Sequence, residues 1–271
     1  PSVYGIQAFN SNGYQYGHAT SNQVAYTFRK QSKFFDIQTY TGSGSGGKVV
    51  SHNLGMVPGM VWIKPTQDSG AWIVWHKSAK NSDGSAYSTT NQRQYTSFST
   101  AAYNDPGGVW LTSVTDTAIT FETGYAMVNS NNKTYVAYFF GDYESSDSVI
   151  KCGNYTCGSG NTEISLGFEP QMVMIKRTVD VAEDWLMLDT MRGFVTTGDD
   201  VTTDLQKDLL PNSTAAEATP SYAGVSPTPT GFKVRTGLDT MYAASGGVYI
   251  YMAIRKAPMA TQTVASNVFE V

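Results

Sequence analysis

The chain has 271 residues, of which 41% are hydrophobic and 13% aromatic, and this is enough for a core in each of two ~110-residue domains. Only 15% of the residues are charged, against ~25% in an average globular protein. The net charge is −4 and no basic run exceeds two residues, which excludes nucleic acid as a partner because phosphate neutralisation needs clustered Lys and Arg. No apolar run approaches ~18 residues, so we expect no membrane insertion.

Residues 1–32 are predicted to be the C-terminal part of a preceding repeat. Val24-Ala25-Tyr26 recurs 112 residues later as Val136-Ala137-Tyr138, and it predicts a strand over residues 24–28. Two explanations stay open: the chain is part of a longer array of domains, or it is a two-domain protein with additional strands at its two ends. The retained spacing favours the array. We expect this strand to pair with another chain or to lie at a sheet edge, because edge backbone groups are unsatisfied.

Residues 33–145 are predicted to form an antiparallel β-sandwich. Short runs rich in β-branched and aromatic residues alternate with Gly, Ser, Asn and Pro, which is typical of strands and turns. The predicted strands are residues 36–41, 48–52, 60–64, 72–76, 109–113, 118–122 and 134–140. The runs 134–140 and 72–76 are apolar on both faces, which indicates central strands covered on both sides. No crossover helices are predicted that could connect parallel strands.

Residues 146–258 repeat this domain. The run PGMVWIK at 58–64 reappears as PQMVMIK at 170–176, and AITFETG at 118–124 reappears as GFKVRTG at 231–237, with offsets of 112 and 113 residues. This period exceeds the ~20–50 residues of a solenoid repeat and equals one domain. We therefore predict an all-β protein of two tandem antiparallel β-sandwiches, a partial third repeat at the N-terminus, and a linker or further element over residues 259–271.

The two repeats match worst over residues 77–105 and 190–229. Such a divergent segment on a constant scaffold predicts a variable surface, so we expect that replacing residues 190–229 would leave the fold intact. Within it, residues 203–210 hint at a helix that ends at Pro211.

The histidines are His18, His52 and His76. The repeat places Ile164 opposite His52 and Asp189 opposite His76, so neither imidazole is kept in both copies. A general base or metal ligand is one interpretation. A histidine that is hydrogen-bonded or exposed at a strand end is the one we favour.

Cys152 and Cys157 are separated by four residues. They could form half a metal site or a local disulfide, but no second Cys/His pair has ligand spacing. We predict free thiols, and no metal or cofactor.

Acidic residues gather in the second repeat, at Asp180, Glu183, Asp184, Asp199, Asp200 and Asp204. Paired carboxylates serve glycoside hydrolysis and oxygen ligands bind calcium, but neither spacing matches a known pattern. Solvated loops are the usual explanation. Without a nucleophile elbow, phosphate loop or dinucleotide motif, we predict no catalytic residue and no enzyme.

The tryptophans, Trp62, Trp72, Trp75, Trp110 and Trp185, could form a sugar-stacking platform. Trp72 and Trp185 are equivalent by the repeat, while Met174 and Leu188 replace Trp62 and Trp75, so we assign these four to the core. Only Trp110 is expected to face outward.

The segments DIQTYTGSG at 36–44, VSHNLG at 50–55, VPGMVWIK at 57–64 and NKTYVAYF at 132–139 resemble a tandem β-domain of bacteriophage virion proteins, found in tailed phages of marine bacteria and cyanobacteria. A surface with little charge is common on such particles.

The resemblance implies a non-enzymatic structural component of the virion, part of a tail fibre or other appendage, that contributes to host-surface attachment and assembly. Its partners would be other virion proteins, further copies of itself, and a host-surface glycan or protein. The alternative is a depolymerase or hydrolase acting on host surface glycan, and the resemblance carries no catalytic residues.

Overall fold

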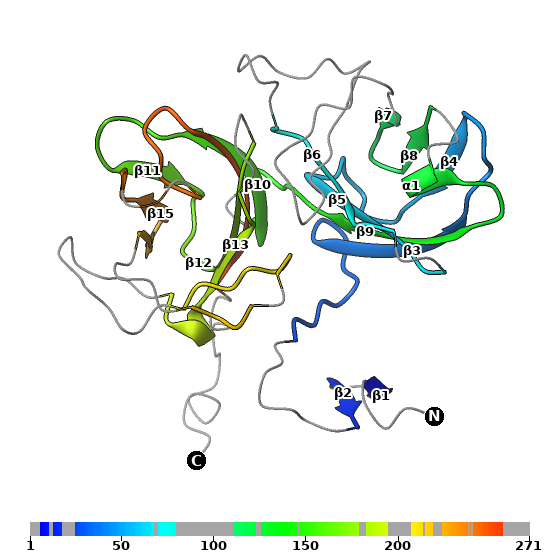
Figure 1. Cartoon of the computed structure of the whole chain (residues 1–271), viewed down its shortest axis with the longest axis horizontal. Coiled ribbons are helices and arrows are strands. Elements are labelled where there is room, and N and C mark those ends of the chain that lie inside the picture. The colour runs from blue at the N-terminus through cyan, green and yellow to red at the C-terminus, as the bar shows by residue number, and fades with distance from the viewer. Residues whose placement is uncertain are drawn as a thin grey trace.

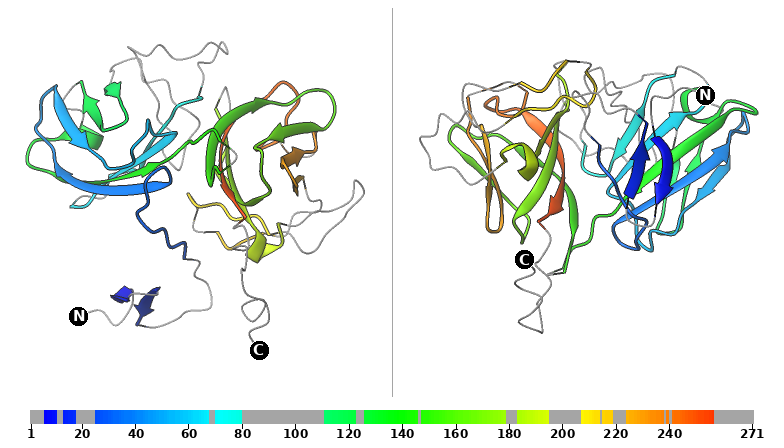
Figure 2. Two further views of the ribbon diagram at one scale, coloured as in Figure 1. Left: turned by 180° about the vertical axis from the view of Figure 1, so that it is seen from behind. Right: turned by 90° about the horizontal axis from the view of Figure 1, so that it is seen from below.

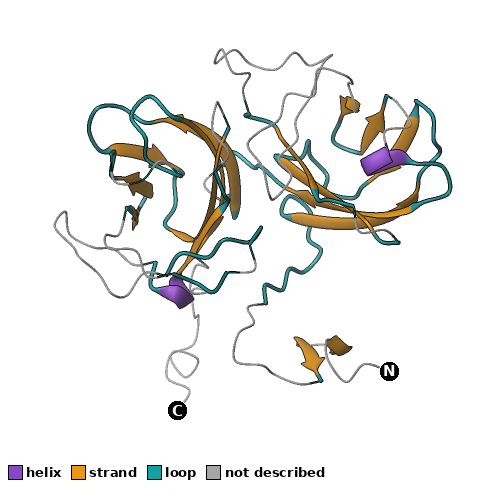
Figure 3. Cartoon of the chain, in the orientation of Figure 1, coloured by secondary structure: helices purple, strands orange, loops and turns teal. Residues whose placement is uncertain are grey.

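The computed structural model describes residues 6–10, 13–17, 25–67, 70–79, 111–122, 126–145, 147–178, 183–194, 207–213, 215–218, 224–237, 239 and 241–256. Within these residues the chain is almost entirely β-structure, as predicted (Figures 1 and 3). The helices described are one short α-helix, α1 (Ala126–Asn129), and one 3-10 turn, η1 (Thr190–Arg192).

The first sandwich consists of two antiparallel sheets. Its strands are β3 (Phe35–Thr41), β4 (Lys48–Ser51), β5 (Met60–Pro65), β6 (Ile73–His76), β7 (Leu111–Val114), β8 (Ala118–Phe121) and β9 (Thr134–Phe140). One sheet has the order β3-β9-β5-β6 and the other β4-β8-β7. The apolar β9 is central, as its two-faced pattern predicted.

The second sandwich has the same strand order. Its strands are β10 (Ile150–Thr156), β11 (Thr162–Ser165), β12 (Pro170–Arg177), β13 (Leu186–Asp189), β14 (Val225–Thr228), β15 (Gly231–Val234) and β16 (Val248–Arg255). They form the sheets β10-β16-β12-β13 and β11-β15-β14. Each strand of the first sandwich thus has a counterpart at the same place in the second, which is the all-β tandem sandwich that the repeats predicted.

The four large sheets form two sandwiches of two sheets each. Each sandwich encloses its own buried core between its three-stranded and four-stranded sheets. The other faces of the two four-stranded sheets contribute to a third buried cluster, which we call the seam. The three-stranded sheets lie on the outer sides of the molecule, with β11 and β15 on the left and β4, β7 and β8 on the right of Figure 1; Figure 2 gives two further views.

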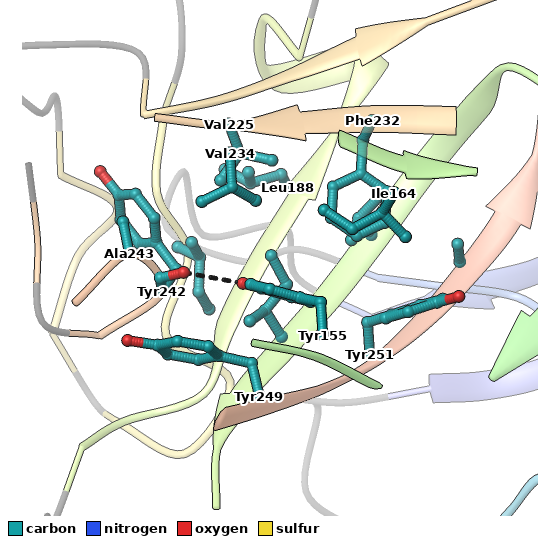
Figure 4. Packing of buried hydrophobic residues seen from close by; sticks show 14 of the residues in the cluster. Tyr155, Ile164, Leu188, Val225, Phe232, Val234, Tyr242, Ala243, Tyr249 and Tyr251 are labelled. Carbon is teal, nitrogen blue, oxygen red and sulfur yellow. Dashed lines mark hydrogen bonds between the residues drawn. The ribbon is translucent and has the colours of Figure 1, made fainter. Parts of the chain in front are cut away.

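A pair of stacked tyrosines recurs in both cores. Tyr40 and Tyr135 stack with ring centroids 5.2 Å apart, and Tyr155 and Tyr249 do so at 4.9 Å. The first tyrosine of each pair donates its hydroxyl to a carbonyl in the segment before the last strand: Tyr40 to Val128 in α1 at 2.6 Å, and Tyr155 to Tyr242 at 2.8 Å (Figure 4). Burial raises the pKa of Tyr155 well above its ordinary value, so the hydroxyl stays protonated as a donor. The repeated sequence thus preserves a hydrogen-bonded aromatic core.

Three expectations about the elements were wrong. Residues 25–30 contain no strand, and residues 207–210 form isolated bridges, not the end of a helix. Strand β6 is buried at every residue but is the last strand of its sheet in the described part of the chain, not a central one.

Residues 190–229 are not merely a variable loop. They contain β14, whose Val225 is fully buried in the second core. Replacing the whole segment would therefore remove a strand of the sandwich. Residues 80–105, most of the first divergent segment, lie outside the described residues.

The N-terminal strands β1 (Ile6–Asn10) and β2 (Gly13–Tyr16) form a hairpin. The membership of residues 1–32 in a preceding repeat remains a prediction.

Candidate functional site

Two of the polar residues that the sequence marked as candidates, His76 and Cys152, lie at the seam. Its buried members from the first repeat are Phe35, Met60, Val74, Ala79 and Phe140, and those from the second are Ile150, Cys152, Met172, Met174, Trp185, Met187, Ile250, Met252 and Ile254. Apolar side chains thus cover part of the outer face of each four-stranded sheet, so the two sandwiches share one buried cluster.

His76 crosses the seam with a hydrogen bond. Its Nδ1 accepts from the backbone N–H of Ser78 at 3.1 Å, so the ring proton is on Nε2, which donates to the carbonyl of Tyr251 at 3.0 Å. The side chain is 1% exposed, and burial together with the nearby Lys77 lowers its pKa to about 4. His76 is therefore neutral at pH 7 and both nitrogens are used in joining the sandwiches.

Two further polar contacts join the repeats beside His76. Asn154 donates its side-chain amide to the carbonyl of Ser78 at 3.2 Å. Asp142, in the connection between the sandwiches, pairs with Lys77 and accepts the backbone N–H of Cys152 at 2.9 Å. The buried polar groups named here thus have partners, as buried polar groups require.

His52 has a structural role inside the first sandwich. Its Nδ1 accepts from Leu54 N–H at 3.3 Å, Nε2 lies 3.2 Å from the carbonyl of Thr115, and the ring packs on Phe139 at 4.6 Å. Burial lowers its pKa. Both histidines are thus hydrogen-bonded beside strand ends, the interpretation favoured from the sequence; His18 lies outside the described residues.

Asp189 occupies the position of His76 in the second repeat, since each pairs with the equivalent methionine of the neighbouring strand. Its carboxylate accepts from Met191 N–H at 2.9 Å, pairs with Arg192, and accepts the hydroxyl of Tyr26 at 2.6 Å. Residues 25–30 are therefore connected to the second sandwich. No sequence pattern indicates the Tyr26 contact, because it joins residues 163 positions apart.

The two cysteines are free and buried, as predicted. Cys152 belongs to the seam, whereas Cys157 lies in the core of the second sandwich, on the other side of β10. Burial raises the pKa of Cys152 to about 12 and raises that of Cys157 as well. The thiols point away from each other, which rules out the disulfide and the shared metal site. Among the described residues, no group of three or more His, Cys, Asp and Glu could bind a metal ion.

The acidic residues that the structure describes are engaged in structural contacts. The backbone carbonyl of Glu183 accepts from Lys176, just as Gly70 accepts from the equivalent Lys64. Asp184 accepts from the side-chain amide of Asn212. The remaining candidates, Asp180, Asp199, Asp200 and Asp204, lie outside the described residues.

The tryptophans divide into two groups. Trp75 and Trp185 are buried, as predicted. Trp62 and Trp72 are partly exposed and lie beside Tyr138, so the prediction that they are wholly core residues was wrong. Trp110 is outside the described residues.

The fold and its contacts define a class of protein: two β-sandwiches of one topology, joined by a buried seam. The chain belongs to the family described as Domain of unknown function (DUF7483), whose model matches residues 7–258 and thus spans both sandwiches. No curated protein and no solved structure matches the chain. In the described part of the chain, no helix has the length and apolar character needed to cross a membrane.

Proposed function

We propose that this protein is a non-enzymatic structural component of a bacteriophage virion, part of a tail fibre or other appendage that contributes to attachment and assembly. The seam is the observation that supports this proposal most directly. It joins the two sandwiches through a buried apolar cluster and several hydrogen bonds, so we expect the two domains to move as one rigid body and not independently of each other. A rigid body with a weakly charged surface suits a particle component.

The chemistry of the candidate residues also favours binding over catalysis. His76 and His52 use both ring nitrogens within the protein, and the buried thiols have pKa values raised above the ordinary range. A general base needs a free nitrogen within reach of substrate, and a nucleophilic cysteine needs a low pKa. The glycan depolymerase remains the alternative to test, because four of its candidate carboxylates lie outside the described residues.

The virion setting comes from the sequence resemblance, and particle labelling tests it. Purified particles carrying this chain would be incubated with antibodies against residues 146–258 and imaged by electron microscopy. We expect label on a tail fibre or another appendage. Absence of label from particles that have been opened as well as from intact ones would contradict the proposal.

A second assay separates attachment from hydrolysis. The purified chain would be incubated with host-envelope polysaccharide, and reducing ends would be measured over time. We expect no increase above the buffer blank. A steady release of reducing ends that depends on protein concentration would favour the depolymerase.

A further inference from the structure

The outer face of the β3-β9-β5-β6 sheet carries a cluster of aromatic side chains beyond the buried part of the seam. Trp62 lies on β5, Tyr138 is its partner on β9, and Trp72 directly precedes β6. The ring centroids of Trp62 and Trp72 are 6.3 Å apart and those of Trp72 and Tyr138 are 5.7 Å apart. We call these three residues the aromatic face.

Comparison of the two repeats shows that two of these three aromatic residues occur in the first repeat alone, whereas Trp72 has the buried Trp185 as its equivalent. Met174 and Met252 take the places of Trp62 and Tyr138, and both are 0% exposed. In the first repeat the same positions are partly exposed to solvent. Methionine is a flexible filler for a closed core, whereas aromatic rings are large and rigid. The rings at positions 62 and 138 thus occur in the repeat in which these positions are partly exposed.

Hydroxyl groups continue the same sheet face. Thr39 and Thr41 are exposed on β3, where Thr39 lies two residues, or ~7 Å, beyond the row of Tyr138. Thr66 is exposed as well, and its Oγ1 lies 2.5 Å from Oγ1 of Thr134. Apolar rings beside adaptable hydroxyls match a ligand that has both an apolar face and hydroxyl groups.

The size of the surface decides between a small ligand and a protein partner. An aromatic side chain buries ~150–250 Å² when it is fully covered, so three partly buried ones offer far less than the ~800 Å² per partner of a stable protein interface. The ammonium group of Lys64 on β5 donates to the carbonyl of Gly70, so an anionic ligand would have to displace this hydrogen bond to pair with it.

We propose that the aromatic face binds the pyranose units of a surface polysaccharide, stacking on their C–H faces. This inference rests on the proposed function and specifies its ligand class. The Trp and Tyr rings supply contact area, and the threonine row supplies hydrogen bonds to sugar hydroxyls. Three partly exposed rings contact a few units within a chain, and binding gains strength from many copies on one particle.

The variant W62M/Y138M tests this assignment. It installs the residues that the second repeat already carries at these positions, so the sheet is expected to keep its fold, which a circular dichroism spectrum and a urea midpoint would check. The control is V49T, because Val49 is 52% exposed on β4 of the other sheet.

Binding would be measured by saturation-transfer NMR and calorimetry with α- and β-linked hexasaccharides of glucose, mannose, galactose and N-acetylglucosamine. We expect at least one to bind, about tenfold more weakly to W62M/Y138M because two stacking contacts are lost, and unchanged to V49T. Binding to no hexasaccharide, or equal binding to W62M/Y138M, would overturn the inference. So would a wild-type dimer that W62M/Y138M dissociates in sedimentation. Particle labelling is independent of this result, so the inference can fail while the proposed function stands.

Discussion

At the scale of single residues, the seam depends on a histidine that must stay neutral. Both nitrogens of His76 are hydrogen-bonded in a site that is 1% exposed, and Lys77 lies nearby. A proton on Nδ1 would break the bond from Ser78 and leave a charge in the apolar cluster. The same position in the second repeat is Asp189, which also accepts a backbone N–H two residues later.

Stability should therefore fall in acid through His76. The pKa is lowered from 6.5 to about 4 in the folded protein, so the unfolded chain binds the proton first, and the contribution that is complete above pH 6.5 is lost as the pH falls toward 4. The loss is ~3 kcal/mol in total. Urea midpoints at pH 7, 5.5 and 4 would measure it. H76Q is the matched variant because glutamine keeps a donor and an acceptor without titrating. Equal pH slopes for both proteins would contradict the role of His76.

The two thiols should report separately on the seam and on the second core. Cys152 lies in the seam and Cys157 within the sandwich, and burial suppresses the thiolate of both. Because a seam can open without unfolding the cores beside it, we expect alkylation of Cys152 at a lower urea concentration than that of Cys157. Pulsed iodoacetamide labelling with peptide mass spectrometry would show this order. Identical midpoints would mean that the seam and the second sandwich unfold together.

At the scale of elements, the repeated strands differ where they meet the seam. Gly59 immediately precedes β5, and its counterpart in the second repeat is Gln171, within β12. A Cβ on Gly59 would lie 2.6 Å from Cβ of Asp142 and 2.7 Å from Cβ of Cys152. Only glycine allows the connection between the sandwiches to approach this strand so closely.

G59A should therefore destabilise the protein by ~1–3 kcal/mol, the usual cost of overpacking a filled site. The control is G160A, because a Cβ on Gly160 has no neighbour within 4 Å, and its urea midpoint should stay close to that of the wild type. Equilibrium urea unfolding would compare the three proteins. A neutral G59A would show that the seam is looser at this point than its distances indicate.

At the scale of the whole molecule, neither sandwich is complete alone. Each four-stranded sheet has an apolar core on one side, and the seam buries part of its other side. Separation would expose residues such as Phe140 and Met252 to water, which is the type of surface that drives aggregation.

Fragments 25–145 and 146–257 should therefore be poorly soluble when produced separately and should copurify when produced together. V74D places a charge in the seam from the first repeat and should prevent copurification. The control V49T alters an exposed valine on the opposite sheet and should have no effect. Affinity purification through a tag on one fragment would measure this. Two soluble, monomeric fragments without mutual affinity would contradict a required seam.

The amino-acid sequence by itself determined the strands, the class and the pairing of the repeats. Alternating apolar residues and Gly-rich turns act locally, so β9 and its counterpart β16 could be predicted from their patterns, and equal offsets between runs such as 58–64 and 170–176 placed corresponding strands in both sandwiches. Structural roles for His52 and His76 could be inferred because the other repeat has no histidine at the equivalent positions.

Only the tertiary structure decided which sheet faces pack against each other and which remain partly exposed. Periodicity shows that a strand has two apolar faces but not what covers them, so it could not separate a core tryptophan such as Trp185 from the partly exposed Trp62. The bonds from Tyr26 to Asp189 and from His76 to Tyr251 join residues 163 and 175 positions apart. Contacts at such separations arise from the packing of finished sheets, and local sequence patterns carry no information about that packing.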